Sequence, residues 1–184
     1  LNHGDPGRAL RRMNELGMLA KFIPEIEPIV AMMQFNMYHH YTVDEHTIQC
    51  ITHLAQIERR ELEEELPIAS NILNEGLNRK VLYVALLLHD IGKGRDEDHA
   101  ILGARIARKV APRLGLDKAE SDTVEWLVRY HLLMSDMAQK RDISDPRTIR
   151  DFAKAVQTAK RLDLITVLTV CDIRGVGPTT WNNW

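Results

Sequence analysis

Residues 81–100 read VLYVALLLHDIGKGRDEDHA, and the stretch changes character halfway along. Its first part, Val81–Leu88, is apolar on every side, which predicts a helix buried in the core. His89 and Asp90 follow directly, so we expect this pair where the core opens to solvent. Burying an imidazole beside a carboxylate is costly unless a partner compensates both, and a divalent cation does this well. An ordinary helix end closed by a glycine cap is the simpler explanation of the same residues.

Two further residues favour the cation. Thr42 and Glu45 have the spacing of a capping box, which predicts a helix that begins just before His46. Asp172 lies near the end of an almost wholly apolar segment, Leu162–Ile173, where a carboxylate needs a partner. The sequence thus offers two imidazoles and two carboxylates on three predicted helices.

The remaining pattern predicts an all-α fold. Asp-Pro pairs at residues 5–6 and 145–146 are typical helix starts, with the aspartate as the N-cap. No segment shows the alternation of apolar and polar residues that marks a strand. We therefore expect a bundle of seven to nine helices that forms a single domain over residues 1–184, and we expect this domain to be a piece of a longer protein.

Composition excludes several classes of function. Lys and Arg number 24 against 26 Asp and Glu, a net charge of −2, so no basic surface for nucleic acid or membrane is predicted. No apolar run reaches the ~20 residues of a membrane span. The two cysteines, Cys50 and Cys171, fall inside helical patterns, which favours reduced thiols and a cytoplasmic location.

His46, His89, Asp90 and Asp172 on an all-helical chain resemble the motif of the HD superfamily of metal-dependent phosphohydrolases. Further segments are similar to the HD domain of one family within it, the bifunctional PII uridylyltransferase/uridylyl-removing enzymes. These segments are YHHYTVDEHT (Tyr38–Thr47), LLLHDIGKG (Leu86–Gly94), DHAILGA (Asp98–Ala104), HLLMSDMAQKRDISDP (His131–Pro146) and LTVCDIRGVGPTTWNNW (Leu168–Trp184).

The resemblance implies one or two divalent metal ions. The four motif residues form a nitrogen and oxygen ligand set that suits Mn²⁺ best, with Mg²⁺ or Fe²⁺ as other candidates. In two-metal HD families the motif aspartate bridges the ions and two more histidines complete the second site, which would assign this role to His99 and His131. These families carry a His-His pair where this chain has Tyr130-His131. Both histidines also fit an ordinary helix end.

The chemistry that follows is hydrolysis at phosphorus by metal-activated water, with Asp90 as the catalytic carboxylate. The resemblance gives Lys93 a role in binding the substrate phosphate, although a solvated lysine fits the same position. Lys140 and Arg141 are candidates for further phosphate contacts. The sequence contains no Gly-x-Ser-x-Gly elbow and no phosphate-binding P-loop.

Three functions are compatible with this sequence. The first is removal of UMP from the uridylylated PII signalling protein of nitrogen metabolism, in a longer chain that also holds nucleotidyltransferase and ACT domains. The second is an HD-type nucleotide or cyclic-nucleotide phosphohydrolase, which has the same metal site without the last two of the similar segments. The third is a non-catalytic helical module whose metal is structural or absent.

Overall fold

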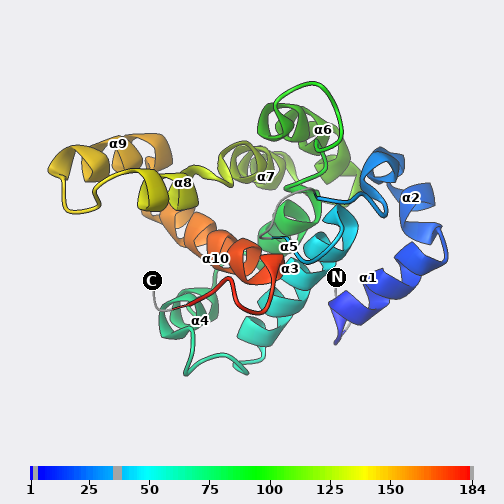
Figure 1. Cartoon of the computed structure of the whole chain (residues 1–184), viewed down its shortest axis with the longest axis horizontal. Coiled ribbons are helices and arrows are strands. Elements are labelled where there is room, and N and C mark those ends of the chain that lie inside the picture. Colours follow the sequence, from blue (N-terminus) through cyan, green and yellow to red (C-terminus); the bar gives the residue numbers. More distant parts are fainter. Residues whose placement is uncertain (2–3, 35–38, 183–184) are drawn as a thin grey trace.

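The fold is all-helical, as predicted. The computed structural model describes residues 1, 4–34 and 39–182, and over these residues it contains ten α-helices, one 3-10 helix and no strand (Figure 1). The elements are α1 (Pro6–Glu15), α2 (Met18–Phe22), η1 (Pro24–Ile29), α3 (Val43–Glu58), α4 (Pro67–Asn74), α5 (Arg79–Leu88), α6 (His99–Arg113), α7 (Lys118–Tyr130), α8 (Leu133–Lys140), α9 (Pro146–Val156) and α10 (Ala159–Val176).

Helix α5 lies at the centre of the bundle. All eight residues from Val81 to Leu88 are buried, because α3, α6, α7 and α10 pack around the helix. Each buried Leu or Val of this kind contributes about 1.5–3 kcal/mol relative to an exposed one. Figure 1 shows α1 and α2 on one side of this centre, and α8 and α9 extending from the other. The C-terminal end of α5 is therefore held rigidly among its neighbours.

The predicted helix starts are correct, with one difference in how α3 begins. Asp5, Asp98 and Asp145 accept backbone hydrogen bonds as N-caps. Thr42 is the N-cap of α3, but its side chain makes no capping bond. The Thr42 hydroxyl hydrogen bonds with Asp44 instead, and Glu45 turns to the guanidinium of Arg11, 2.6 Å away. The capping box was thus wrong in detail, although it located the helix.

The helix count exceeds the expected seven to nine because α8 and the short α2 were not predicted. Helix α8 has no fully buried residue and packs against the core through the partly buried Leu133 and Met134, a pattern too short to have been predicted as a helix. The helix packs against α9 and α10 at the edge of the bundle. Its position matters because it borders the cavity described below.

A close approach of backbone brings α6 to the end of α5. A Cβ atom on Gly92 would collide with the carbonyl of His99 and the amide nitrogen of Gly103. Glycine at this position therefore lets the turn after α5 lie directly against the first turn of α6. This contact places His99 beside the His-Asp pair.

Candidate metal centre

The six predicted ligands come from five helices and converge at one place. His46 lies in the first turn of α3, His89 and Asp90 follow α5, and Asp172 lies in the last turns of α10. His99 begins α6, and His131 is the C-cap of α7. The structure therefore brings together all six residues that the sequence pointed to, while their role as metal ligands stays a prediction.

Asp90 is the shared member of two ligand groups. Its Oδ2 lies 3.4 Å from His89 Nε2 and 3.7 Å from His46 Nε2. Its Oδ1 faces the opposite way, 3.6 Å from His131 Nε2 and 3.7 Å from His99 Nε2. The Asp90 side chain is only 3% exposed, so a carboxylate with these neighbours can bridge two cations but has little access to water.

The first group is completed by Asp172. Its Oδ1 lies 3.0 Å from His46 Nε2 and 3.5 Å from His89 Nε2, and the two imidazole Nε2 atoms are 3.2 Å apart. Ligand atoms bound to one ion at about 2.0–2.2 Å lie at separations of this size. We call His46, His89, Asp90 and Asp172 the first group, and Asp90, His99 and His131 the second group.

Backbone carbonyls fix the orientation of two imidazoles. His89 Nδ1 donates to the carbonyl of Leu86 and His131 Nδ1 to the carbonyl of Val128, each at 2.7 Å. An imidazole whose Nδ1 carries the donated proton presents the lone pair of Nε2 to a metal. Both Nε2 atoms point toward Asp90, which is the arrangement that metal-binding histidines require.

The second group contains buried nitrogen atoms with unused lone pairs. His99 Nε2 and His131 Nε2 are both inaccessible and make no hydrogen bond within the described residues. A buried polar atom without a partner is unfavourable, and most proteins avoid it. A divalent cation between these nitrogens and Asp90 Oδ1 would satisfy both, so the residues of the second group fit a metal.

The two groups differ in their electrostatics. Burial lowers the pKa of His46 and His89, but Asp172 and Asp90 outweigh burial, so the pKa of His46 rises and that of His89 reaches about 9. Burial raises the pKa of Asp90, yet His89 and Lys93 hold it well below its usual range. The metal-free first group therefore keeps a proton at neutral pH.

The second group behaves in the opposite way. Burial lowers the pKa of His99, and burial together with the nearby charge of His89 lowers the pKa of His131. Neutral imidazoles bind metal without first losing a proton. The imidazoles of the second group therefore need not lose a proton before a cation binds at neutral pH.

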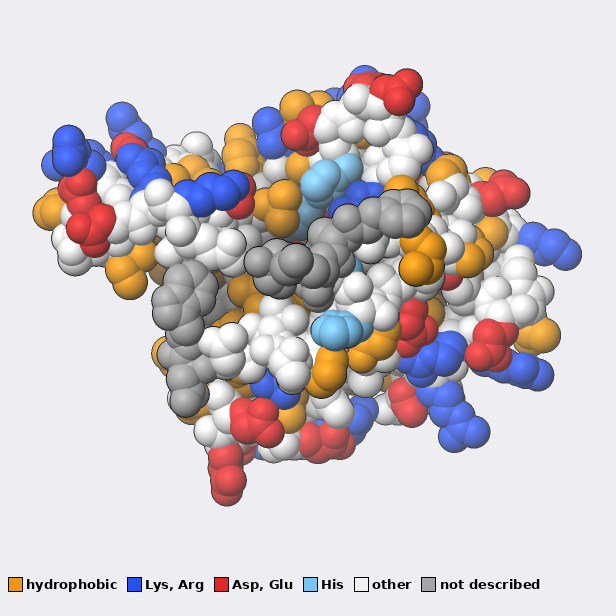
Figure 2. All heavy atoms as spheres, in the orientation of Figure 1, with side chains coloured by type: hydrophobic (Ala, Val, Ile, Leu, Met, Phe, Trp, Pro, Cys, Tyr) orange, Lys and Arg blue, Asp and Glu red, His pale blue; other side chains and the backbone are white. Residues whose placement is uncertain are grey.

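Lys93 lies against the shared carboxylate. Its Nζ is 2.8 Å from Asp90 Oδ2 and 2.9 Å from the side-chain oxygen of Gln34. The side chain is 22% exposed and borders a cavity of about 830 Å³ that opens from the ligand groups to solvent. Figure 2 shows histidine side chains that reach the surface on this face, near α6 and near the end of α10. Lys93 therefore places its amine between the shared carboxylate and this cavity.

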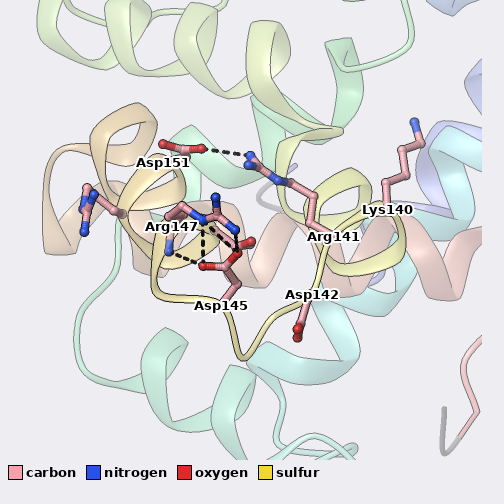
Figure 3. A pocket seen from close by; sticks show the side chains of 8 residues that line it. Lys140, Arg141, Asp142, Asp145, Arg147 and Asp151 are labelled. Carbon is pink, nitrogen blue, oxygen red and sulfur yellow. Dashed lines mark hydrogen bonds and ion pairs between the residues drawn. The ribbon is translucent and has the colours of Figure 1, made fainter.

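Lys140 and Arg141 lie elsewhere. They border a separate surface hollow between α8 and α9, where Arg141 pairs with Asp151 at 3.0 Å (Figure 3). Lys140 pairs with Asp136 at 2.8 Å, and in Figure 3 its amine extends away from the Arg141 pair. The structure does not bring either cation to the cavity beside the ligand groups.

One neighbour was not predicted to belong to the site. Cys50 Sγ lies 3.6 Å from His46 Nε2, and it is close enough to His89 and Asp172 to belong to the same cluster. Cys50 and Cys171 are both free and buried, and burial raises the pKa of the Cys50 thiol. A neutral thiol packs against the His46 ring. The spacing of four residues on one helix was the available signal.

Comparison with known proteins agrees with this geometry. The family model of the HD domain matches residues 43–167, which is more than half of the chain. The chain belongs to the HD-domain family. The match ends five residues before Asp172, so this predicted ligand on α10 lies beyond the matched stretch.

The chain is also similar to three curated proteins, each named bifunctional uridylyltransferase/uridylyl-removing enzyme. It is 83% identical to the protein of Ruegeria pomeroyi and 79% identical to that of Cereibacter sphaeroides, over all 184 residues. It is 57% identical to the protein of Azospirillum brasilense over 180 residues. The HD domain described here spans about one-fifth of the length of these relatives: 20%, 20% and 19%. None of its helices, among the described residues, is long and apolar enough to cross a membrane.

We predict that metal binding by the first group releases protons. His89, with a pKa of about 9, is protonated in the metal-free protein at neutral pH, and a cation must displace that proton. Affinity for Mn²⁺ should therefore rise between pH 6.5 and 8, by up to about tenfold per pH unit for each proton released. Calorimetry in two buffers of different ionisation enthalpy counts the protons.

His53→Ala is the matched control, because His53 Nδ1 bonds with Gln56 on the same helix and lies outside both groups. Its proton release should equal that of the wild type. Equal Mn²⁺ affinity of the wild type at pH 6.5 and pH 8, without release of protons, would contradict the account of the first group.

Proposed function

We propose that this HD domain removes UMP from uridylylated PII by metal-dependent hydrolysis of the phosphodiester that links UMP to a tyrosine. The observation that carries the proposal is the Asp90 carboxylate, with one oxygen toward each ligand group. The printed names of the relatives include a uridylyl-removing activity. PII as the substrate comes from the resemblance in the segments at residues 131–146 and 168–184.

The donor set supports two ions per domain, with Mn²⁺ as the preferred metal. His46, His89, Asp90 and Asp172 would hold one ion, and Asp90, His99 and His131 the other. Mixed imidazole and carboxylate ligands suit Mn²⁺ or Fe²⁺ better than Mg²⁺, which prefers oxygen ligands and water. When bound, such ions make water a nucleophile at neutral pH and offset charge on the phosphoryl oxygens.

The residues of the chain then have separate tasks. Asp90 fixes the spacing of the two groups, because a single buried carboxylate belongs to both. The carbonyls of Leu86 and Val128 hold the imidazoles of His89 and His131 in their orientation. Lys93 faces the cavity and stabilises the negative charge of the phosphate.

Water attacks phosphorus, the bond from phosphorus to the tyrosine oxygen breaks, and the products are UMP and a free tyrosine. The phenol has a pKa of about 10 and is a better leaving group than an alkyl alcohol. The larger assembly that we propose contains nucleotidyltransferase and ACT domains in the same polypeptide, and it acts in the cytoplasm.

We predict that Lys93→Ala separates metal binding from turnover. Its ammonium competes with a cation for Asp90 Oδ2, so the variant should bind Mn²⁺ at least as tightly as the wild type. The kcat should fall by about 10²-fold, the loss typical of one charge-stabilising group. Equilibrium dialysis and steady-state kinetics measure the two effects.

Asp90→Ala is the comparison for that experiment, because it removes the shared ligand and should abolish both metal binding and activity. If Lys93→Ala lost its metal to the same extent as Asp90→Ala, the assignment of Lys93 to the substrate would be wrong.

We predict the reaction itself for the full-length protein. Incubated with uridylylated PII and Mn²⁺, it should release UMP and restore the free tyrosine, whereas Asp90→Ala should not. In ¹⁸O-water the label should enter the UMP phosphate and not the tyrosine, because the attack is at phosphorus. Mass spectrometry of both products reads the label. A protein that left uridylylated PII intact but cleaved free nucleotides would be a nucleotidase with the same metal centre.

A further inference from the structure

The cavity beside the metal centre has two chemically different walls. One wall is α8 with its N-cap: Leu132 is the cap, and Ser135, Asp136 and Gln139 follow along the helix. The other wall begins with the apolar side chains of Ile173 and Val176 at the end of α10, which follow Asp172, and continues into Thr179, Thr180 and Asn182. A substrate phosphate at the ligand groups would thus lie between the polar side chains of α8 and the apolar end of α10.

The polar wall is one complete face of α8. Residues 132, 135, 136 and 139 have the spacing of a single helix face, and all four line the cavity. Helix α8 packs against the core through the partly buried Leu133 and Met134, which leaves the face of residues 132, 135, 136 and 139 toward the cavity. The face combines a hydroxyl, a carboxylate and an amide, which are groups that recognise a polar ligand.

These groups match the parts of a nucleoside. A carboxylate accepts hydrogen bonds from sugar hydroxyls, as acidic residues do at the ribose of dinucleotides. A glutamine amide offers one acceptor and donors in a plane, the complement of the uracil edge with its N–H and carbonyl groups. The apolar α10 wall suits the phenol ring of a tyrosine, which has no comparable set of polar groups.

We propose that α8 is the nucleoside-binding wall, where Asp136 accepts from the ribose hydroxyls and Gln139 pairs with the uracil edge. This assignment rests on the proposed function, because it takes the substrate to be a uridylyl ester. The tyrosine lies on the opposite side, against Ile173 and Val176. Selectivity for a uridylyl group is then built into the face of α8 that does not pack against the core.

Lys140 supports the proposed nucleoside-binding wall through its ion pair with Asp136. It lies one helical turn after Asp136 and pairs with its Oδ1 at 2.8 Å, outside the cavity lining. An acidic residue four positions before a lysine is the favourable order on a helix. Lys140 therefore positions the Asp136 carboxylate and offsets its charge, which would otherwise repel the substrate phosphate.

The test compares three p-nitrophenyl phosphodiesters with the same leaving group: the uridine 5′, 2′-deoxyuridine 5′ and methyl esters. The full-length protein with Mn²⁺ should hydrolyse the uridine ester with a kcat/KM at least about tenfold above that of the methyl ester, as expected when a substrate's polar groups are bound. Gln139→Ala should reduce this ratio by about tenfold, the loss of one hydrogen bond or two. Asp136→Asn should reduce the preference for uridine over 2′-deoxyuridine.

Ratios between substrates distinguish recognition from damage to the fold, because a misfolded site loses all three activities alike. Ala138→Gln is the matched control: it adds an amide to an exposed position of α8 outside the cavity lining, and its ratios should equal those of the wild type. A wild type with equal kcat/KM for the uridine and methyl esters would overturn the assignment of α8. So would Gln139→Ala and Asp136→Asn variants that keep both the wild-type kcat/KM for the methyl ester and the wild-type ratios. A wild type that hydrolyses none of the esters, and also fails to release UMP from uridylylated PII, would overturn the proposed function instead.

Discussion

The carboxylate of Asp90 is the group on which the site depends. It is almost wholly buried, has histidine nitrogens within 3.4–3.7 Å of both its oxygens, and pairs with the ammonium of Lys93. A buried charge is unfavourable unless opposite charges compensate it. The Asp90 carboxylate therefore needs positive charges beside it both with and without bound metal. Protons on His89 and the amine of Lys93 supply them in the metal-free molecule, and the same geometry accommodates metal ions.

The fold provides these compensating groups because the ends of several helices meet around Asp90. Helix α5 is buried along its whole apolar length and ends at the His-Asp pair, so Asp90 cannot move away from its neighbours. Gly92 allows α6 to approach closely enough for His99 to face the same carboxylate. Helices α3, α7 and α10 add His46, His131 and Asp172. The predicted ligands are therefore held by the packing of the core.

The sequence was sufficient to predict the site residues that lie at the ends of buried apolar segments. The run before His89, the cap before His46 and the apolar segment around Asp172 located the first group, because those residues interrupt patterns that are otherwise regular. Side chains whose position depends on exposed helices were harder to place. Helix α8 packs against the core through the partly buried Leu133 and Met134, a pattern too short to predict either the helix or the face it turns to the cavity.

The positions of the basic residues were difficult to predict for the same reason, because they too depend on exposed helices. Lys140 and Arg141 were expected near the phosphate, but their ion-pair partners on α8 and α9 are set by local helix geometry that charge pattern alone does not reveal. The contact of Lys93 with Asp90 follows the spacing of three residues, and its second partner, Gln34, comes from a loop far away in the sequence. A single histidine at positions 130–131 is sufficient for the second group, because Asp90 and His99 complete it.

Electron paramagnetic resonance of the Mn²⁺-loaded protein tests the central claim most directly, because two manganese ions that share one carboxylate are magnetically coupled. We expect the signal of a coupled pair to grow as the second equivalent of Mn²⁺ binds to the wild type, and only the signal of a single ion in His131→Ala. A wild-type protein that shows only uncoupled Mn²⁺ at saturation would contradict the assignment of Asp90 as the bridge between two metal sites.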